Sequence, residues 1–373
     1  MAAGLDAVGI APARPFLETR RHLEERRAAG LHGGMQFTYR NPGRSTDPAR
    51  ILEGAQAIVV GARRYPSIRP EKAEDQPENE ARSSGVVARY ASADHYAPLR
   101  AALGAVADRA RADGWQARVV ADDNALVDRE AARRAGLGWY GKNTNLLLPG
   151  LGSWFVLGEV VTDAPLPTAP ELVADGCGSC RRCLPACPTG ALVAPGVLDA
   201  RRCLAWLLQA TGDFPVDFRE ALGGRLYGCD DCQEVCPENI IADRAPSGRS
   251  EPDRSVATAD DRPHPDLLAV LRAGDQELME QFGRWYIPQR QPRYLRRNAL
   301  IALGNTAQGN DPAVEEALRR ALADPDPLLR GHAVWACARL GRPDLLALVA
   351  DDQDQAVRRE LDAAGAVAPR VAG

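Results

Sequence analysis

The sequence lacks the long apolar segment that a membrane-spanning helix requires. No run of about 18 consecutive apolar residues occurs in the 373 residues, so we expect no transmembrane span and no membrane partner. The first residues, Met1–Pro12, contain no basic stretch followed by a long apolar stretch, so no secretory signal is predicted. Hydrophobic residues make up 45% and charged residues 26% of the chain, which is ordinary for a globular protein. We therefore expect a cytoplasmic protein.

An overall basic excess is also missing. The net charge is −4, so the chain as a whole does not have the charge of a typical nucleic-acid-binding protein. Only a local basic segment would serve that purpose. No signature of symmetric self-association is visible, and a monomer is the default expectation.

Cysteine is the residue whose number and spacing carry the most information. Nine cysteines are an odd number, and disulfides are rare in a reducing cytoplasm, so a full disulfide framework is not expected. Eight of them lie in two runs and the stretch between these runs, and both runs end in Cys-Pro. The runs are Cys177-x2-Cys180-x2-Cys183-x3-Cys187-Pro188 and Cys229-x2-Cys232-x3-Cys236-Pro237. The ninth cysteine, Cys337, lies in an apolar helical stretch and is interpreted as a buried structural thiol.

This spacing is typical of bacterial ferredoxins that hold two [4Fe–4S] clusters. In those proteins the fourth cysteine of a run ligates the other cluster. The same logic assigns one cluster to Cys177, Cys180, Cys183 and Cys236, and the other to Cys187, Cys203, Cys229 and Cys232. Zinc is the alternative, since paired Cys-x2-Cys motifs also bind it, but the eight cysteines and both Cys-Pro endings favour clusters. Clusters carry electrons and do no bond chemistry, so a further cofactor or a partner is required.

The pattern along the chain predicts a multidomain α/β (α+β) protein. Residues 1–170 read as an α/β domain, with short buried strands at Ala57–Gly61 and Trp115–Val120 and a helix at Leu99–Asp113. The predicted parts that follow are a ferredoxin-like module at 171–245, a connecting segment at 246–289 and a helical repeat domain at 290–373.

The helical part contains a weak internal repeat. The segment Asp324-Pro-Asp-Pro-Leu-Leu-Arg330 is similar to Asp352-Gln-Asp-Gln-Ala-Val-Arg358. A step of roughly 30 residues between helix pairs favours stacked HEAT-like repeats. So few units are expected to need support from the rest of the chain.

A glycine-rich segment fits two nucleotide-binding patterns but not their context. Gly136-Leu-Gly-Trp-Tyr-Gly141 matches GxGxxG, and Lys142-Asn143 nearly completes a P-loop. Both motifs need a strand immediately before the glycines, whereas Asp128–Ala135 reads as a helix. Asn143 also lacks the hydroxyl that a P-loop presents to Mg²⁺. Nicotinamide or ATP binding is therefore not expected here, although the turn still allows a ligand to approach the backbone closely.

Two adjacent acids, Asp122 and Asp123, end the predicted strand before this helix. They could be solvated residues that cap the helix, because Asp is a common cap residue. Alternatively, a partly buried acid with a raised pKa could donate a proton in a reduction. Composition alone favours the capping interpretation.

Four segments together carry a specific family resemblance. Three of them, Ala135-Gly-Leu-Gly-Trp139, Gly141-Lys-Asn-Thr144 and Gly152-Ser-Trp-Phe-Val-Leu-Gly158, resemble epoxyqueuosine reductase. So does Gly224-Arg-Leu-Tyr-Gly-Cys-Asp-Asp-Cys-Gln-Glu-Val-Cys-Pro237. The likeness covers nearly the whole chain, the helical repeat included.

This resemblance implies an oxidoreductase that reduces epoxyqueuosine to queuosine at the wobble position of tRNA. It implies a cobalamin in the domain at 1–170, beside the two [4Fe–4S] clusters, and an external one-electron donor such as a flavodoxin or ferredoxin. The chain lacks the Asp-x-His-x-x-Gly pattern that supplies a cobalt-ligating histidine in many cobalamin proteins. That absence fits cobalamin bound without a protein histidine ligand, as the resemblance implies.

The resemblance also implies roles for single residues. Asp122 matches the family's proton donor and also lies at the cofactor, while Asp123 has no counterpart. Arg44, Leu146, Leu157 and Asp230 match positions of corrin contacts. From the residues alone, Arg44 could equally be a surface arginine and the two leucines core residues, and Asp230 must lie near a cluster because it separates Cys229 from Cys232.

The chain departs from the family pattern in two places. Ala205 stands where relatives commonly have serine, which removes one hydrogen bond that the corrin could receive. The segment Tyr90–Tyr96 is one residue shorter than usual, with His95 and Tyr96 in swapped order. No contact is therefore assigned around residue 95.

One segment has the local charge of a nucleic-acid surface. Between Gln281 and Asn310 there is no acidic residue, and the aromatic residues Trp285, Tyr286 and Tyr294 alternate with arginines. Arginine binds phosphate with two parallel hydrogen bonds, and aromatic rings stack on unpaired bases. An amphipathic helix with its aromatic residues packed inward is the alternative. With the resemblance, binding of the tRNA anticodon stem-loop is favoured, through Arg284, Arg290, Arg293, Arg296 and Arg297.

Two other functions compete with this interpretation. A cobalamin-dependent reductive dehalogenase is similar in using cobalamin with two such clusters, but the missing export signal and the arginine-rich segment argue against it. A non-catalytic iron–sulfur electron carrier, with the repeats as an interaction scaffold, is the second. The large domain before the clusters argues against a carrier, which needs only the cluster module.

Overall fold

The computed structural model describes residues 4–65, 83–168, 171–244 and 264–367, which fold into two compact units. Unit 1 contains the described residues of Met1–Ser67, Ala93–Cys203 and Asp230–Ala257. Unit 2 contains those of Ile68–Ser92, Leu204–Cys229 and Thr258–Gly373. The chain passes between the units more than once, and the limits of the four predicted domains stay predictions.

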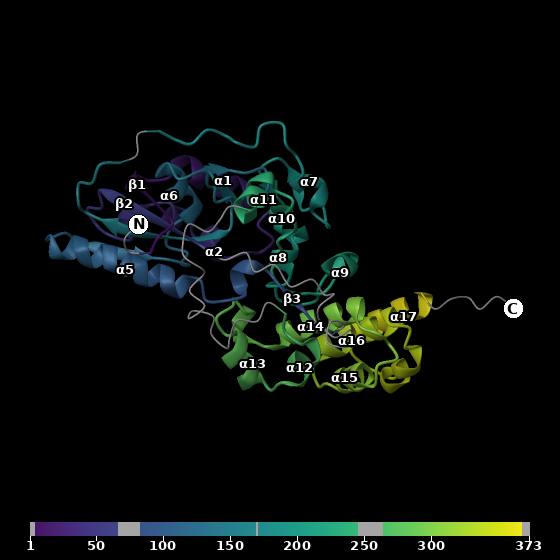
Figure 1. Ribbon diagram of the computed structural model, residues 1–373. Helices are drawn as coiled ribbons and strands as arrows, with labels where there is room; N and C mark the ends of the chain where they lie inside the picture. Colours follow the sequence, from purple (N-terminus) through teal and green to yellow (C-terminus); the bar gives the residue numbers. More distant parts are fainter. Residues whose placement is uncertain (1–3, 66–82, 169–170, 245–263, 368–373) are drawn as a thin grey trace. The chain divides into compact units, whose positions relative to one another are not determined.

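Unit 1 is built around a four-stranded sheet of order β1-β2-β7-β4, in which neighbouring strands are antiparallel. The strands are β1 (Ala7–Pro12), β2 (Ala57–Arg64), β4 (Ala117–Val120) and β7 (Phe155–Thr162). The two inner strands, β2 and β7, are almost continuously buried because helices cover both faces of the sheet. Figure 1 shows α5 (Tyr96–Ala112) along one face and α1 (Leu17–Ala28) and α6 (Asp128–Arg134) on the other.

Most predicted elements of this unit are confirmed. The predicted strand Ala57–Gly61 lies in β2, and the predicted helix Leu99–Asp113 lies in α5 apart from its last residue. The predicted strand Trp115–Val120 begins only at Ala117. Its first residues still close the end of α5: the backbone N–H of Trp115 donates to the Ala110 carbonyl at 3.1 Å, and the Trp115 side chain is 41% exposed.

The other elements of unit 1 are short helices and strands outside the four-stranded sheet. Two hairpins are β5 with β6 and β8 with β9. In chain order these elements are α2 (Phe37–Arg40), α3 (Pro42–Ser45), η1 (Pro48–Arg50), β5 (Trp139–Tyr140), β6 (Leu146–Leu147), α7 (Cys183–Ala186), β8 (Leu192–Ala194), β9 (Val197–Leu198), η4 (Ala200–Arg202), α10 (Asp231–Glu234) and α11 (Pro237–Arg244).

Unit 2 is mainly helical and has its own apolar core (Figure 1). The long helices are α14 (Arg293–Thr306), α15 (Pro312–Leu322), α16 (Pro327–Arg339) and α17 (Gln355–Val367). The remaining elements are β3 (Val86–Val87), η3 (Arg89–Ala91), α8 (Leu204–Leu207), α9 (Val216–Leu222), β10 (Arg225–Tyr227), α12 (Leu267–Arg272), α13 (Asp275–Phe282), η6 (Pro288–Arg290) and η7 (Pro343–Val349).

The internal repeat predicted from the sequence is a helix-capping device. Asp326 caps α16 by accepting the Leu328 N–H, and Asp354 caps the start of α17 by accepting the Ala356 N–H. The repeats are then joined to each other, because Arg330 pairs with Asp352 at 2.6 Å. The similar Asp-rich segments thus each begin a helix, as stacked repeats require.

The predicted connecting segment at 246–289 is ordered structure in its described part. From residue 264 onward it contains α12 and α13, and Leu267, Leu278 and Phe282 belong to the core of unit 2. Residues 245–263, where the sequence is richest in Pro, Ser and Asp, lie outside the described residues.

Gly158 provides a test of how closely α5 packs on the sheet. A Cβ at this position of β7 would lie 2.7 Å from Leu103 Cδ1 and 2.9 Å from the Ala121 Cβ. We expect Gly158→Ala to destabilise unit 1 by about 1–3 kcal/mol through overpacking, measured as a lower midpoint in thermal unfolding. The control is Gly104→Ala within α5, where a Cβ meets nothing within 4 Å. That change is expected to be neutral or to stabilise by up to about 1 kcal/mol, and equal losses in both variants would contradict the packing argument.

Candidate functional site

The first predicted set of cluster ligands comes together in unit 1. Burial raises the pKa of the Cys183 thiol, and negative charge on Cys236, Cys177 and Cys180 acts in the same direction, which places all four sulfurs within electrostatic reach of one another. Cys236 immediately precedes α11; burial raises the pKa of its thiol, and the backbone N–H groups of Asn239 and Glu238 act in the opposite direction. N–H groups directed at a thiolate are what an iron–sulfur ligand requires.

Lys142 and Asn143 of the glycine-rich segment hold the two cysteine runs in place. The Lys142 ammonium donates to the carbonyl of Gly178 at 2.5 Å and to that of Cys180 at 2.8 Å. The Asn143 amide donates to the carbonyl of Cys232 at 3.2 Å. As predicted, a helix, α6, precedes the glycines. The segment therefore serves as a support for the cysteine loops, and its resemblance to a P-loop is superficial.

In the second predicted set of cluster ligands, the sulfur contacts of Cys187 are the clearest. Its sulfur accepts the Ala191 N–H at 3.2 Å and lies 3.7 Å from the Thr189 hydroxyl. Cys203 and Cys232 also lie in unit 1, whereas Cys229 is the last residue of its segment in unit 2. All eight cysteines are free thiols of intermediate exposure. The assignment of this second set stays a prediction.

Across the described residues, no group of three or more His, Cys, Asp or Glu side chains is arranged around one metal ion. The ligand sulfurs of a cubane stand farther apart than those around a single ion, so a cluster does not need such an arrangement. Cys337 is fully buried in the core of unit 2, as expected for a structural thiol.

Asp122 stands just beyond the end of β4 in an unusual backbone conformation. Its φ is +56°, the left-handed region that Asp and Asn tolerate better than other non-glycine residues. Partial desolvation raises the pKa of its carboxyl, Asp94 and Asp123 add to this effect, and Arg100 opposes it. Asp123 accepts the Ala125 N–H at 2.8 Å, which is a local turn. The two acids therefore differ in their surroundings: Asp122 has a raised pKa, and Asp123 stabilises a turn.

The structure adds residues around Asp122 that the sequence did not single out. Asp94 begins α5 by accepting the N–H groups of Tyr96 and Ala97, and so brings a second carboxyl to this place. Burial strongly raises the pKa of the Tyr96 phenol, and the nearby charge of Asp122 contributes. The ring of His95, the residue before Tyr96, stacks on that of Tyr65, with the ring centroids 5.1 Å apart. The swapped His-Tyr order hid these residues from a comparison by pattern alone.

The predicted corrin contacts fall into different environments. Arg44 is exposed on α3, as a residue that binds a ligand group would be. Leu146 is 2% and Leu157 7% exposed, and both pack in the apolar core of unit 1. Their side chains therefore lie below the protein surface. Asp230 is mostly buried and accepts the Gln233 amide at 3.1 Å. Of these four residues, Arg44 is the one whose side chain is exposed enough to contact a ligand.

The arginine-rich segment of unit 2 separates into exposed and occupied residues. Arg284, Tyr286 and Arg290 are exposed, but the Arg284 guanidinium also donates to the carbonyls of Ala91 and Ser92, both at 2.9 Å. Trp285 and Tyr294 are buried, with 5% and 7% exposure. The inward packing of aromatic residues that was the alternative is therefore correct for two of the three. Arg293 pairs with Asp326 at 2.8 Å and Arg296 with Asp275 at 2.6 Å.

The expectation that Arg297 contacts tRNA is wrong. Its side chain is fully buried, and its guanidinium donates to the carbonyl oxygens of Leu207, Ala210 and Gly212. Burial lowers the pKa of Arg297 to about 9. A guanidinium that completes the hydrogen bonds of a buried loop is not free to bind phosphate, so Arg297 stabilises the fold.

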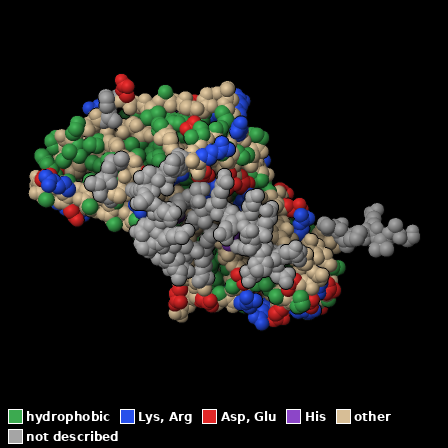
Figure 2. Space-filling model, viewed as in Figure 1, with side chains coloured by type: hydrophobic (Ala, Val, Ile, Leu, Met, Phe, Trp, Pro, Cys, Tyr) green, Lys and Arg blue, Asp and Glu red, His purple; other side chains and the backbone are tan. Residues whose placement is uncertain are grey.

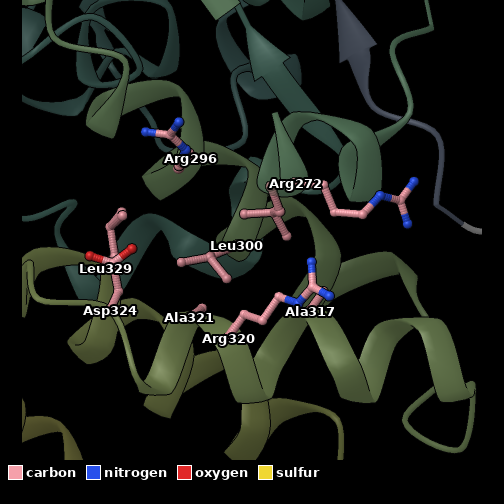
Figure 3. A pocket seen from close by; sticks show the side chains of 9 residues that line it. Arg272, Arg296, Leu300, Ala317, Arg320, Ala321, Asp324 and Leu329 are labelled. Atoms are coloured by element: carbon pink, nitrogen blue, oxygen red, sulfur yellow. The ribbon is translucent and has the colours of Figure 1, made fainter. Parts of the chain in front are cut away.

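Further arginines surround a small pocket of unit 2 formed by α12, α14, α15 and the start of α16. Figure 3 shows Arg272, Arg296 and Arg320 around its apolar floor, with Asp324 beside it. Each arginine has an acidic neighbour: Asp266, Asp275 and Glu316, respectively. In Figure 2, side chains of both charge signs alternate over this part of the repeats. The repeat surface is thus not uniformly basic, and the exposed arginines at 284–290 remain the best candidates for phosphate contacts.

In the described part of the chain, no helix is both long enough and apolar enough to cross a membrane.

Comparisons with known proteins agree with this arrangement. Residues 176–239 match the 4Fe-4S double cluster binding domain, and residues 287–365 match HEAT repeats, which confirms the predicted cluster-binding module and helical repeats. The chain is 32% identical to the epoxyqueuosine reductase of Bacillus anthracis, over 96% of this chain and 90% of that protein. It is 36% identical to that of Xanthomonas campestris pv. campestris, over 87% and 89%.

A solved structure shows the same likeness in three dimensions. The crystal structure of an epoxyqueuosine reductase with an epoxyqueuosine-modified stem loop of tRNA-Tyr has a TM-score of 0.85 and 32% identity to this chain. The match covers 98% of this chain and 96% of that one. The epoxyqueuosine reductase of Streptococcus thermophilus is similar, with a TM-score of 0.84, 29% identity and the same coverage.

Proposed function

Because this chain belongs to the epoxyqueuosine reductase family, we propose that it reduces epoxyqueuosine to queuosine at the wobble position of tRNA. The observation that carries the proposal is the likeness over nearly the whole length of both chains to a reductase bound to a modified tRNA stem loop. The same proposal assigns the enzyme to the cytoplasm, with an external one-electron donor such as a flavodoxin or ferredoxin.

The cysteine module is the entry point for electrons in this proposal. Two [4Fe–4S] clusters would be held by Cys177, Cys180, Cys183 and Cys236, and by Cys187, Cys203, Cys229 and Cys232. The gathering of the first four sulfurs supports the first set, and the N–H that Ala191 donates to Cys187 supports a thiolate in the second. Lys142 and Asn143 keep the loops of both runs in position.

Cobalamin is the cofactor that this family membership implies beside the clusters. When bound, it would supply a cobalt centre that accepts single electrons and acts on the substrate carbon or oxygen. The exposed Arg44 would bind an amide oxygen of the corrin side chains. Leu146 and Leu157 would support the site from within the core, and Asp230, which lies between Cys229 and Cys232 in the sequence, would contact the corrin.

Asp122 would deliver the proton that the reduction needs. Removing an epoxide oxygen as water consumes protons as well as electrons, and a neutral carboxylic acid is a suitable donor. Its pKa is raised by desolvation, so the neutral form persists to a higher pH than for an ordinary Asp. Activity limited by this acid is therefore expected to fall as the pH rises through its pKa.

We expect Asp122→Asn to lower turnover by about 100-fold or more while iron content and cobalamin binding stay unchanged. Asn tolerates the positive φ at this position, so the backbone is expected to be retained. Turnover is measured with epoxyqueuosine-containing tRNA under anaerobic conditions. The matched control is Asp123→Asn, which keeps the turn oxygen and should remain active. Full activity of the Asp122 variant would refute the acid role.

The tRNA anticodon stem-loop would bind at the exposed arginines of unit 2. Arg284 and Arg290 are exposed, and Tyr286 between them is 44% exposed, so its ring would stack on a base. Arg284 would exchange the carbonyls of Ala91 and Ser92 for phosphate. Arg293 and Arg296 would take part only by exchanging an acidic partner for phosphate. Arg297 is left out because it is buried.

Arg290→Ala should weaken tRNA binding several-fold and lower the slope of log K against log salt by about one. The arginine contributes a phosphate contact in this proposal, and its only described bond is to the Gly283 carbonyl. Binding is titrated at several salt concentrations. Arg320→Ala, which removes a repeat arginine paired with Glu316, is the control and should leave the slope unchanged. The same slope in all three proteins would reject this surface.

Anaerobic purification with analysis of iron, sulfide and cobalt separates the proposed function from its rivals. Two cubanes predict about eight irons per chain, and the reductase predicts about one corrinoid after cobalamin is added. Clusters without affinity for a corrinoid would favour an electron carrier. Clusters and corrinoid without turnover of the tRNA substrate would favour a dehalogenase-like enzyme, and zinc in place of iron would overturn the cluster assignment.

A further inference from the structure

A carboxylic acid lies where the core of unit 1 is otherwise apolar. Glu159 is at the centre of β7, directly opposite Val60 of β2 and Val120 of β4, and is fully buried. On the same face of the strand its neighbours are Leu157 and Val161, both members of the apolar core under α6. A buried carboxyl in such a place is stable only if it is protonated or paired.

The only partner described for this carboxyl is a second carboxyl, that of Asp128. No N–H donor among the described residues reaches either Glu159 oxygen, and the Asp128 Oδ1 is likewise buried without a donor. Asp128 is half-buried as a residue, its Oδ1 is buried, and a hydrogen bond with its carboxyl contributes to the raised pKa of Glu159. Two carboxyl groups bond to each other only if one carries a proton, so the pair holds at least one.

Burial favours a proton on both acids. It raises the pKa of Glu159 well above its usual range, and the charge and hydrogen bond of Asp128 add to this. Burial also raises the pKa of Asp128 to about 7. Other groups facing the pair are Tyr96 on α5, Asp122 and Asp123, and Arg129, the only cation among them. The pair therefore keeps a proton to a higher pH than two solvated carboxyl groups would.

The Asp128–Glu159 pair joins the two ends of the segment 121–128, which carries Asp122. At one end, Asp122 follows Val120, the strand partner of Glu159, by two residues. At the other end, Asp128 begins α6. The Asp128–Glu159 hydrogen bond thus ties the far end of the segment back to β7, beside the point where the segment leaves the sheet. Asp122 has a positive φ, a conformation that persists only when its surroundings hold it.

We propose that Glu159 and Asp128 are positioning residues: the hydrogen bond between their carboxyl groups holds the segment 121–128 on β7 and so places Asp122. The part that concerns catalysis rests on the proposed function, whereas the hydrogen bond and its effect on the segment do not. No bond of the substrate is made or broken by the pair, and its proton stays with it during turnover.

Two substitutions of Glu159 separate the hydrogen bond from packing. Glu159→Gln keeps a donor, because its amide N–H replaces the acid O–H towards Asp128. Glu159→Leu has similar bulk without a donor and suits the apolar surroundings, so its thermal midpoint is expected to be retained or raised. Hydrogen exchange of the segment 121–128 in the full chain should become faster in the Leu variant alone. Turnover should fall on the order of tenfold or more in the Leu variant and much less in the Gln variant.

Infrared spectra of the unliganded protein supply a readout that is independent of activity. The carbonyl band of a protonated acid should persist above about pH 7 in the natural protein and be missing in Glu159→Gln. Absence of that band, or unchanged exchange of the segment in Glu159→Leu, would overturn the proposal. Equal loss of turnover and of thermal midpoint in the Gln and Leu variants would also overturn it. If the natural protein fails to turn over tRNA while band and exchange behave as expected, the proposed function fails and the positioning bond stands.

Discussion

In the proposed cluster site the thiol of Cys236 must meet those of Cys177, Cys180 and Cys183, which lie much earlier in the chain, and this requirement brings the two cysteine runs together. Short loops with tight turns bring three of them together, and α11 places the fourth at its N-terminal end. Thiolates gathered in one place repel each other unless cations or N–H groups compensate. The N–H groups at the start of α11 act in that direction at Cys236, while the Lys142 ammonium holds the first run through the carbonyls of Gly178 and Cys180.

The chain from Asp122 to Lys142 links the cysteine loops to the acid site. Gly141, Lys142 and Asn143 follow β5, and α6, which begins at Asp128, precedes that strand. A chain that runs from Asp122 through α6 and the glycine turn to Lys142 therefore connects the candidate proton donor with the cysteine loops. Because α6 packs on the central strands, a change in the core beneath it would be felt at both places.

Arginine has different functions in the two halves of unit 2. Arg297 satisfies buried carbonyls, and Arg330 joins successive repeats through Asp352. Arg284 and Arg290 lie at the surface. The sequence shows the same residue type in all these places, and its pattern of aromatic neighbours is equally compatible with a nucleic-acid surface and with a packed helix. Only the burial of each guanidinium separates these functions, because the side chain is long enough to reach either inward or outward.

The sequence by itself determined the features that depend on local spacing. Cysteines with two or three residues between them specify a cluster-binding loop, and the Asp-rich segments specify helix starts. A helix directly before Gly136 excludes a dinucleotide-binding fold. Tertiary structure alone decided which residues meet across the sheet. Asp128 and Glu159 are far apart in the chain and belong to no motif, and Glu159 looks like an ordinary solvated acid until its strand is placed between Val60 and Val120. Register between strands and burial of side chains follow from the packing of the whole unit, which no short segment encodes.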